Sequence, residues 1–181
     1  MENITGENQL KFPIGQFIKQ DIYSDTELAS LIASIKQAPA LYRNIAGTLT
    51  ESDFIKTYRP GSWNVKQLFH HVSDIQLLHF FRMKKALTET DYGDVTLINM
   101  DKWAVTPDAI EEAIEDSLLM LEGITKRYVF LIESLGDEQL KVEYYHPVRK
   151  FTVNQSQAIA MSAWHLQHHL SHINIAVSTS L

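Results

Sequence analysis

The sequence predicts an all-α protein, a four-helix bundle, and three observations lead to this fold class. Apolar residues recur at helical spacing in four long stretches. Three of these stretches open on residues that favour a helix N-terminus. Strand-like composition is confined to one short segment. Four amphipathic helices of this length bury their apolar faces most simply against one another, as a bundle.

The first helix is expected over residues 25–49 and the second over residues 64–87. Pro39 lies inside the first helix and predicts a kink, because its ring clashes with the preceding turn. The second helix opens on Asn64, and Gln67 three residues later completes the pattern of a capping box. We therefore expect the second helix to begin sharply at Asn64.

The third helix is expected over 106–136 and the fourth over 152–177. Thr106 and Pro107 form a strong helix start, and Gly136 is expected to end that helix. The fourth is expected to open at Thr152, with Gln155 in the capping-box position. Between them, 141–153 has the β-branched and aromatic character of a short hairpin that precedes the fourth helix. Helices two and three are joined by roughly eighteen residues, more than adjacent antiparallel helices need, which predicts a long crossover loop.

Composition narrows the functional classes. A chain of 181 residues with 45% hydrophobic content suits one domain over 1–181. The net charge of -6, without clustered Lys and Arg, argues against a nucleic-acid partner. With no cysteine, any metal site must use nitrogen and oxygen ligands. The first twelve residues lack a leader pattern and no stretch suits a membrane span, so a cytoplasmic location without membrane association is expected.

Histidine spacing carries the chemistry, because the predicted fourth helix holds four of the eight histidines in WHLQHHLSH. Residues four apart share a helix face, so His165 with His169, or His168 with His172, could direct imidazoles at one ion. Relative to the apolar stripe, His165 and His169 lie on the inward border. The first pair is therefore the predicted ligand pair, and His168 is expected to point toward solvent or a partner.

The predicted second helix supplies a third ligand from the sequence HHVSD. His70 and His71 diverge by about 100°, so only one is expected to face inward, and His71 lies nearer the apolar stripe. Asp74 follows three residues later, where its carboxylate could hydrogen-bond a liganding imidazole or approach a bound water. The sequence thus predicts one divalent ion held by His71, His165 and His169.

Plainer interpretations compete with each of these assignments. Histidines on amphipathic helices also occur as hydrogen-bonded core or surface residues without any ion. His79 lies two turns beyond His71 and suits either a substrate pocket or the core. Tyr145 and His146 lie in the predicted hairpin, where turn and surface roles compete with a place in the pocket.

Several motifs in order resemble the DinB-like proteins, and within them the YfiT-type metal-dependent hydrolases, which are relatives of bacillithiol S-transferases. The resemblance covers nearly the whole chain and is carried by FPIG at 12–15, YRPGSW at 58–63, NVKQLFHHVSD at 64–74, RMKKALTE at 82–89, YYHP at 144–147 and WHLQHHLSHI at 164–173. It implies a four-helix bundle with a three-histidine site at His71, His165 and His169. It also implies zinc or nickel as the ion and a homodimer.

Such a site restricts the chemistry without fixing the reaction. Three neutral imidazoles leave a divalent ion with an open position, where a bound water reaches a pKa of about 7. The first expectation is therefore hydrolysis of a small-molecule substrate by a metal-activated water. The same ion could instead activate a low-molecular-weight thiol for bacillithiol-type S-transfer. A third possibility, from another class, is a non-catalytic metal- or ligand-binding stress-response dimer.

Overall fold

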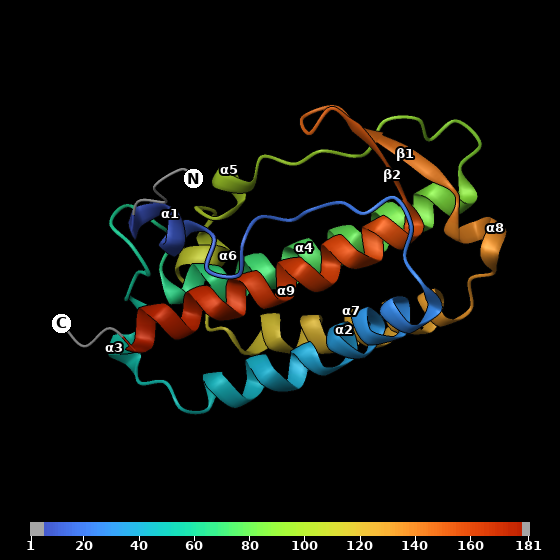
Figure 1. The fold of residues 1–181 in the computed structure, drawn as a ribbon. Helices are drawn as coiled ribbons and strands as arrows, with labels where there is room; N and C mark the ends of the chain where they lie inside the picture. The colour runs from blue at the N-terminus through green and yellow to red at the C-terminus, as the bar shows by residue number, and fades with distance from the viewer. Residues whose placement is uncertain (1–5, 179–181) are drawn as a thin grey trace.

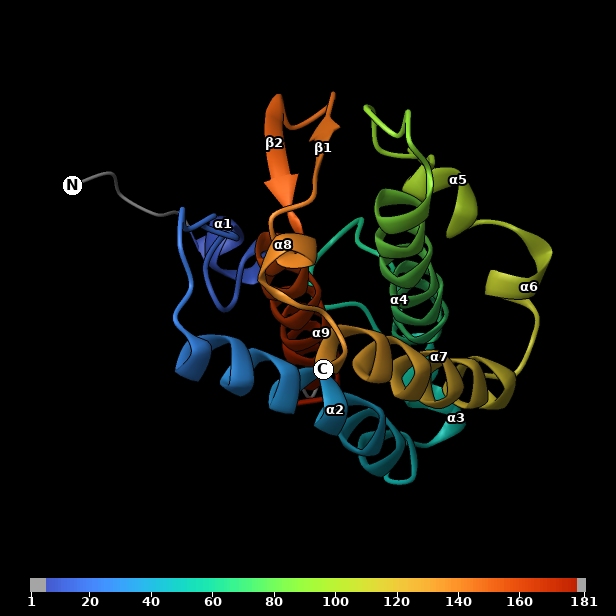
Figure 2. The ribbon, with the colours of Figure 1, turned by 90° about the vertical axis from the view of Figure 1, so that its right-hand side faces the viewer.

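The computed structural model describes residues 6–178, and its centre is a bundle of four long helices. These are α2 (Asp25–Ala46), α4 (Val65–Thr88), α7 (Glu115–Glu133) and α9 (Gln155–Ser178). Each of α2 and α4 packs against both α7 and α9. Figure 2 shows α2 and α7 as one layer and α4 and α9 as the other. The predicted four-helix bundle is confirmed.

The order of the helices explains the long connection. In Figure 1, α4 and α7 run side by side in the same direction, and so do α2 and α9. Parallel neighbours require the chain to return along the bundle between them. Residues 89–114 make this return and include α5 (Met100–Trp103) and α6 (Pro107–Ile110). The predicted crossover is thereby confirmed.

Shorter elements close the ends and one side of the bundle. They are α1 (Gly6–Lys11), α3 (Glu51–Phe54), α8 (Asp137–Leu140) and the strands β1 (Glu143–His146) and β2 (Phe151–Asn154). The two strands pair antiparallel, from Glu143 opposite Asn154 to His146 opposite Phe151. This is the predicted hairpin. Between α1 and α2, residues 12–24 run along the outer side of α9 (Figure 1).

Capping boxes mark the start of α4 and of α9, although the one before α9 was predicted at the wrong residue. In α4 the Gln67 amide N–H donates to Asn64 Oδ1 at 2.9 Å, as predicted. In α9 the expected cap at Thr152 is wrong, because Thr152 pairs with Tyr145 inside the hairpin. The box forms two residues later, where the Gln157 amide N–H donates to Asn154 Oδ1 at 2.9 Å.

The predicted third helix, 106–136, is two helices. Thr106 and Pro107 do start a helix, but it makes only the single turn α6. Ala109 on this turn is buried, and α6 packs on α4, whereas α7 starts afresh at Glu115 and packs on both α2 and α4. The spacing of apolar residues continues from α6 into α7, but the two segments pack against different sets of helices, and this difference divides them. The first helix passes through Pro39 and ends at Ala46, three residues before the predicted end.

The core lies between the two layers and is mainly apolar. Tyr42, Leu68, Leu121, Tyr128 and Ile159 are among its largest fully buried side chains. The Tyr42 hydroxyl donates to the Leu166 carbonyl at 2.7 Å, so its polar atom is satisfied. Among the described residues, no helix has both the length and the apolar character needed to span a membrane.

Residues 1–5, which belong to the segment examined for a leader, and 179–181 lie outside the described residues. The prediction of one domain over 1–181 stays a prediction.

Candidate metal centre

Three histidines from α4 and α9 meet where these antiparallel helices cross. His71 Nε2 lies 3.1 Å from His165 Nε2. The His169 ring centroid lies 4.7 Å from that of His71 and 4.5 Å from that of His165. One ring nitrogen from each residue falls within 4.8 Å of the other two. The structure therefore brings together the three residues that the sequence singles out as ligands.

Burial keeps these three imidazoles neutral. It lowers the pKa of His71 to about 3. The pKa values of His165 and His169 lie well below the usual range, first because the protein desolvates both rings and then because other histidines surround them. A neutral imidazole has one bare nitrogen with a lone pair, which is the form that binds a metal ion.

The cluster fits a divalent ion by distance and by donor type. Nitrogens bound to zinc at about 2.0 to 2.1 Å in a tetrahedral arrangement lie roughly 3.3 Å apart. The 3.1 Å between the two Nε2 atoms is close to this separation. Three nitrogen donors leave one tetrahedral position free for a water or substrate, as in catalytic rather than structural zinc sites.

A hydrogen-bond relay through His172 sets the tautomer of His169. His172 Nε2 lies 3.2 Å from the Lys11 carbonyl, which can only accept, so this nitrogen carries the proton. In the neutral ring His172 Nδ1 is then bare, and it lies 3.3 Å from His169 Nδ1. His169 Nδ1 must therefore donate, which leaves His169 Nε2 bare for the metal.

The remaining helix histidines correct two predictions. His168 is buried rather than facing solvent, because its ring stacks on Trp164 at 4.4 Å and Phe12 covers it from residues 12–24. His70 is buried as well as His71, since it faces α7 and its Nδ1 lies 2.8 Å from Ser117 Oγ. The two adjacent histidines thus face different neighbouring helices, so both are inside.

A second group on α9, made of His168, His169 and His172, also has nitrogens within 4.8 Å of one another. It shares His169 with the first group. Its His172 nitrogens are already used by the Lys11 carbonyl and His169. The group drawn from two helices is therefore the better metal site.

Aromatic side chains from the loop before α4, together with Trp164 on α9, cover part of the histidine cluster. Trp63 packs on His71 with ring centroids 4.6 Å apart. Tyr58 stacks flat on His172 at 3.8 Å. The Trp164 indole N–H donates to the Gly15 carbonyl at 3.1 Å, which fastens residues 12–24 to α9. Two of the motifs noted in the sequence, FPIG and YRPGSW, thus supply the cover of the site.

A cavity of about 410 Å³ opens beside His165. His79 and His146, both expected near the substrate, line it. Tyr145 does not, because alternation along β1 turns its side chain outward, and its backbone instead pairs with Gly93 and Val95. Burial lowers the pKa of His79 to about 3 and that of His146 to about 4, so both are neutral at pH 7.

Asp74 lies on the side of α4 that α6 covers. It is half-buried, and burial together with the negative charge of Asp108 raises its pKa to about 6. Within residues 6–178, no hydrogen bond or ion pair joins Asp74 to His71, His165 or His169. The structure thus places Asp74 near the end of the crossover rather than in contact with the three histidines.

Comparison with known proteins agrees with this geometry. Residues 34–173 match the DinB superfamily. The chain belongs to the DinB superfamily. A relative from Oceanobacillus iheyensis is 34% identical over 171 residues, covering 94% of this chain and 97% of the relative. One from Halalkalibacterium halodurans is 37% identical over 167 residues, covering 92% and 96%. Both carry the name "Putative metal-dependent hydrolase".

Solved structures of similar fold extend the comparison. YfiT from Bacillus subtilis, described as "a probable metal-dependent hydrolase with an unusual four-helix bundle topology", has a TM-score of 0.88 at 28% identity, covering 92% of this chain and 94% of its own. A mycothiol-dependent maleylpyruvate isomerase has a TM-score of 0.65 at 15% identity, covering 84% and 62%. The second likeness is one of fold.

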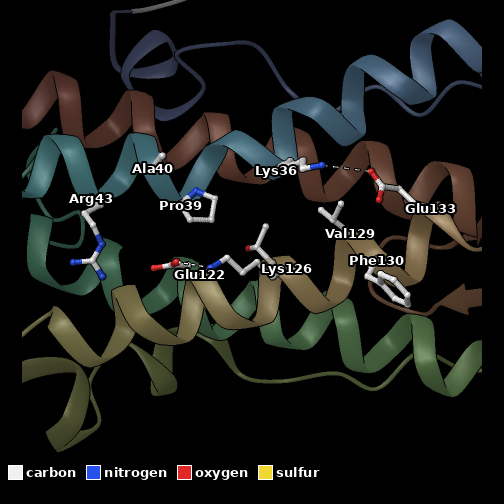
Figure 3. A pocket seen from close by; sticks show the side chains of 10 residues that line it. Lys36, Pro39, Ala40, Arg43, Glu122, Lys126, Val129, Phe130 and Glu133 are labelled. Carbon is white, nitrogen blue, oxygen red and sulfur yellow. Dashed lines mark hydrogen bonds and ion pairs between the residues drawn. The ribbon is translucent and has the colours of Figure 1, made fainter.

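A different cavity in this DinB-superfamily protein lies between α2 and α7, in the other layer (Figure 3). Its charged groups already have partners: Lys126 Nζ lies 2.7 Å from Glu122 Oε1, Lys36 Nζ lies 3.9 Å from Glu133 Oε1, and Arg43 pairs with Glu115 outside the cavity at 3.2 Å. None of its described lining residues is a histidine. It offers a shaped surface but no reactive group.

Sequence reasoning missed three residues of the site. Arg82 could have been found, since it lies eleven residues, three helical turns, beyond His71 on the same face of α4. Arg149 gave no signal, because the turn of the hairpin decides where it lies. His172 was considered only as a ligand, and its role in orienting His169 depends on Lys11, which is remote in sequence.

Proposed function

We propose that this protein is a metal-dependent enzyme that hydrolyses a small molecule. One observation carries the proposal: three neutral imidazoles from two helices, two of them buried and His165 half-buried, converge beside a cavity of substrate size. Ligand pockets commonly have volumes of about 300 to 1,000 Å³, and this cavity falls in that range. The names of the curated relatives support the same class.

The residues around the site would have different roles according to where they lie. His71, His165 and His169 would hold the ion, which when bound would supply Lewis-acid polarisation and lower the pKa of a coordinated water toward about 7. The His79 ring lies 6.1 Å from that of His165 and is neutral, so it can hydrogen-bond the substrate beside the reacting bond. Trp63 and residues 12–24 exclude bulk water. Hydrolysis adds the oxygen of water to the acyl carbon and its proton to the leaving group.

The experiment is metal analysis combined with a chelator-controlled activity screen. Protein purified without metal-affinity columns should contain about one divalent ion per chain, with elemental analysis deciding between zinc and nickel. Ester and amide hydrolysis should stop with EDTA and return when the ion is restored. A metal-free protein, or turnover that persists both in EDTA and in His165→Ala, would overturn the proposal.

Thiol S-transfer is the second candidate, and the fold shared with a mycothiol-dependent enzyme favours testing it. The chain contains no cysteine, so the thiol must come from solution. Bacillithiol with chlorodinitrobenzene is a suitable pair: a C–S bond forms, chloride leaves and the thiol proton passes to solvent. Turnover of this pair without any ester or amide hydrolysis would make the protein a transferase.

A third class is a binding protein without turnover. Stoichiometric metal with no activity in any arm of the screen would favour it. We further propose that the chain forms a homodimer in the cytoplasm, and light scattering coupled to gel filtration tests the dimer through a mass of two chains.

Asp74 enters this proposal as a residue that acts indirectly on the centre. Asp74→Asn should lower activity or metal affinity by about 10 to 100-fold if its carboxylate orients the site through a water. An unchanged activity and affinity would remove Asp74 from the site.

A further inference from the structure

The cavity beside His165 is built from four separate parts of the chain. Its walls come from α4, α9, the crossover before α5, and the turn of the hairpin. Most of the lining is apolar: Ile75, Leu78, Leu97, Ile98, Met100, Val148, Met161 and Trp164. The polar lining consists of His79, His146, His165, Arg82 and Arg149. Such a mixture suits a ligand with an apolar body and one or two polar groups.

The charge inside this cavity is opposite to that of the chain. The chain carries a net charge of -6, with 22 acidic residues. Among the described lining residues none is acidic, and the two charged ones are both arginines, Arg82 and Arg149. A guanidinium group stays protonated throughout the physiological range. The cavity is therefore a local positive site in an acidic protein.

Arg82 has unused hydrogen-bonding capacity. Its side chain is buried, and its Nε and Nη2 atoms donate to the Thr96 carbonyl at 3.0 and 2.7 Å. A guanidinium has five N–H groups, so this contact uses only one edge. Neither Arg82 nor Arg149 forms an ion pair with a carboxylate in the part of the chain that is described. Arg82 is buried, and a buried charge without a partner is costly, whereas Arg149 is exposed where the cavity meets solvent. An anionic ligand would supply the charge that Arg82 lacks and could be reached by Arg149 from the hairpin turn.

The order of residues along one face of α4 shows how a ligand in the cavity would be oriented. His71, Ile75, Leu78 and Arg82 are spaced four, three and four residues apart, so they share one face of the helix. His71 and Arg82 are separated by about 16 Å along the helix axis, at 1.5 Å per residue. The metal centre thus lies toward one end of the cavity wall and the arginines toward the other.

We propose that this cavity binds a small organic anion, with its carboxylate or phosphate at Arg82 and Arg149, its apolar body against Leu78, Leu97 and Trp164, and its reactive bond toward His165. That this anion is the substrate rests on the function proposed above. An anchor remote from the reacting bond places that bond at the metal centre and contributes binding energy to its orientation.

The test uses a matched pair of probes of nearly the same size and shape, one anionic and one neutral. Phenylbutanoate and phenylbutanamide are titrated into the metal-loaded protein by calorimetry, and the carboxylate should bind at least about tenfold tighter. Phenyl phosphate is titrated as a third probe, and its affinity relative to phenylbutanoate decides which oxyanion is preferred. Equal affinity for all three probes would overturn the proposal.

Two arginine variants locate the anion. Arg149→Gln should weaken phenylbutanoate binding by about tenfold or more and leave phenylbutanamide unaffected. Arg82→Lys keeps the charge but loses the two-pronged geometry, so it should also weaken binding, with circular dichroism verifying the fold because Arg82 holds Thr96. Arg127→Gln, on the exposed side of α7, is the matched control and should bind as wild type does. Unchanged carboxylate affinity in Arg149→Gln and Arg82→Lys would contradict the assignment.

A metal-free arm separates this proposal from the proposed function. After EDTA treatment, the carboxylate preference and its dependence on Arg149 should persist. Binding that disappears with the metal would place the anion on the ion and overturn the arginine site. Conversely, metal-dependent turnover without any preference for anions would support the enzyme and reject this cavity as its anion site.

Discussion

The α4–α9 layer and the α2–α7 layer differ in how many residues they bury and in whether those residues are polar. In α4, 15 of 24 residues are buried, and they include histidines, Ser73, Gln76 and Arg82, whereas α2 buries only Ile35, Ala38 and Tyr42. All eight histidines lie on α4, α9 or β1 and none on α2 or α7. Both layers share the same apolar core, so the difference arises on their outer sides.

The outer faces of the two layers differ in what covers them, and this difference determines which layer can hold a reactive site. One face of α2 and α7 is open to solvent, and its charged groups form exposed ion pairs. The outer face of α4 and α9 is covered by residues 12–24, the crossover and the hairpin, so its polar groups are buried and must find partners. A covered polar face can enclose a metal centre away from bulk water, and among the described residues the α4–α9 layer has such a face.

Removing a ligand should produce the largest effect, confined to the α4–α9 layer. His165→Ala or His169→Ala should abolish metal binding, because two imidazoles no longer hold the ion tightly. His168→Ala should retain most of it, since the His168 ring stacks on Trp164 instead of joining His71. Metal content per chain is the measurement. Equal loss in all three variants would show that the ligand set is wrong.

Acid should lower the free energy of unfolding of the metal-free protein, because the buried histidines of α4 and α9 resist protonation. Burial lowers the pKa of His71 and His79 to about 3 and that of His168 and His172 to about 4, below an unfolded value near 6.5. Between these values the unfolded chain binds more protons, so stability is complete above about pH 6.5 and falls as the pH drops. Each such histidine contributes up to about 1.4 kcal/mol per pH unit.

Urea unfolding of the metal-free protein at several pH values measures this slope. The carboxyl of Asp74, with a pKa raised to about 6, acts in the opposite sense, because its burial costs stability as the pH rises from about 4 to 6. Asp74→Asn should therefore steepen the loss on acidification. A free energy of unfolding that is flat from pH 7 to pH 4 would contradict the burial of these histidines.

A core truncation in the α2–α7 layer should separate stability from metal binding. Leu121 on α7 is 1% exposed, so Leu121→Ala should lower the free energy of unfolding by about 2 to 5 kcal/mol. Metal content of the folded protein should stay at the wild-type level, because the ligands lie in the other layer. Chemical denaturation and elemental analysis test the two halves of this expectation. Loss of metal from the folded variant would show that the layers are coupled.

The relay through His172 should produce the smallest effect, on affinity rather than on stoichiometry. His172→Phe keeps a ring against Tyr58 but removes the acceptor for His169 Nδ1, so metal affinity should fall about 10 to 100-fold. His172→Gln, which can both accept and donate, should restore part of the loss. Competition with a chelator gives the affinity, and nitrogen-15 NMR of the metal-free protein reports the His169 tautomer. Wild-type affinity in His172→Phe would exclude the relay.

Features written locally in the sequence could be predicted, and features set by packing could not. The Asn64 capping box, the hairpin near His146 and the convergence of His71, His165 and His169 could be predicted from residue spacing and from the angle of each residue on its helix. The start of α7 did not, because the apolar period runs unbroken from α6 into α7 and only tertiary contacts divide them.

His168 shows the same limit for the site. The sequence predicted that His168 points toward solvent or a partner, and the expectation of solvent was wrong because its side chain is buried. A helical wheel assumes that every side of the helix other than its apolar face meets water. Here Phe12 and Trp164 cover the side on which His168 lies. Arg149 was missed for a related reason, since its place in the cavity depends on the turn of the hairpin.

The parallel pairing of α2 with α9 has a consequence for biosynthesis. Neither helix of the first half can bury its apolar face fully until α9 has left the ribosome, and His71 waits for partners that are 94 and 98 positions away along the chain. Contacts this distant in sequence form late in folding. The three histidines therefore form no cluster until α9 has packed against α4, so an ion that uses all three would be bound only after these distant segments have met.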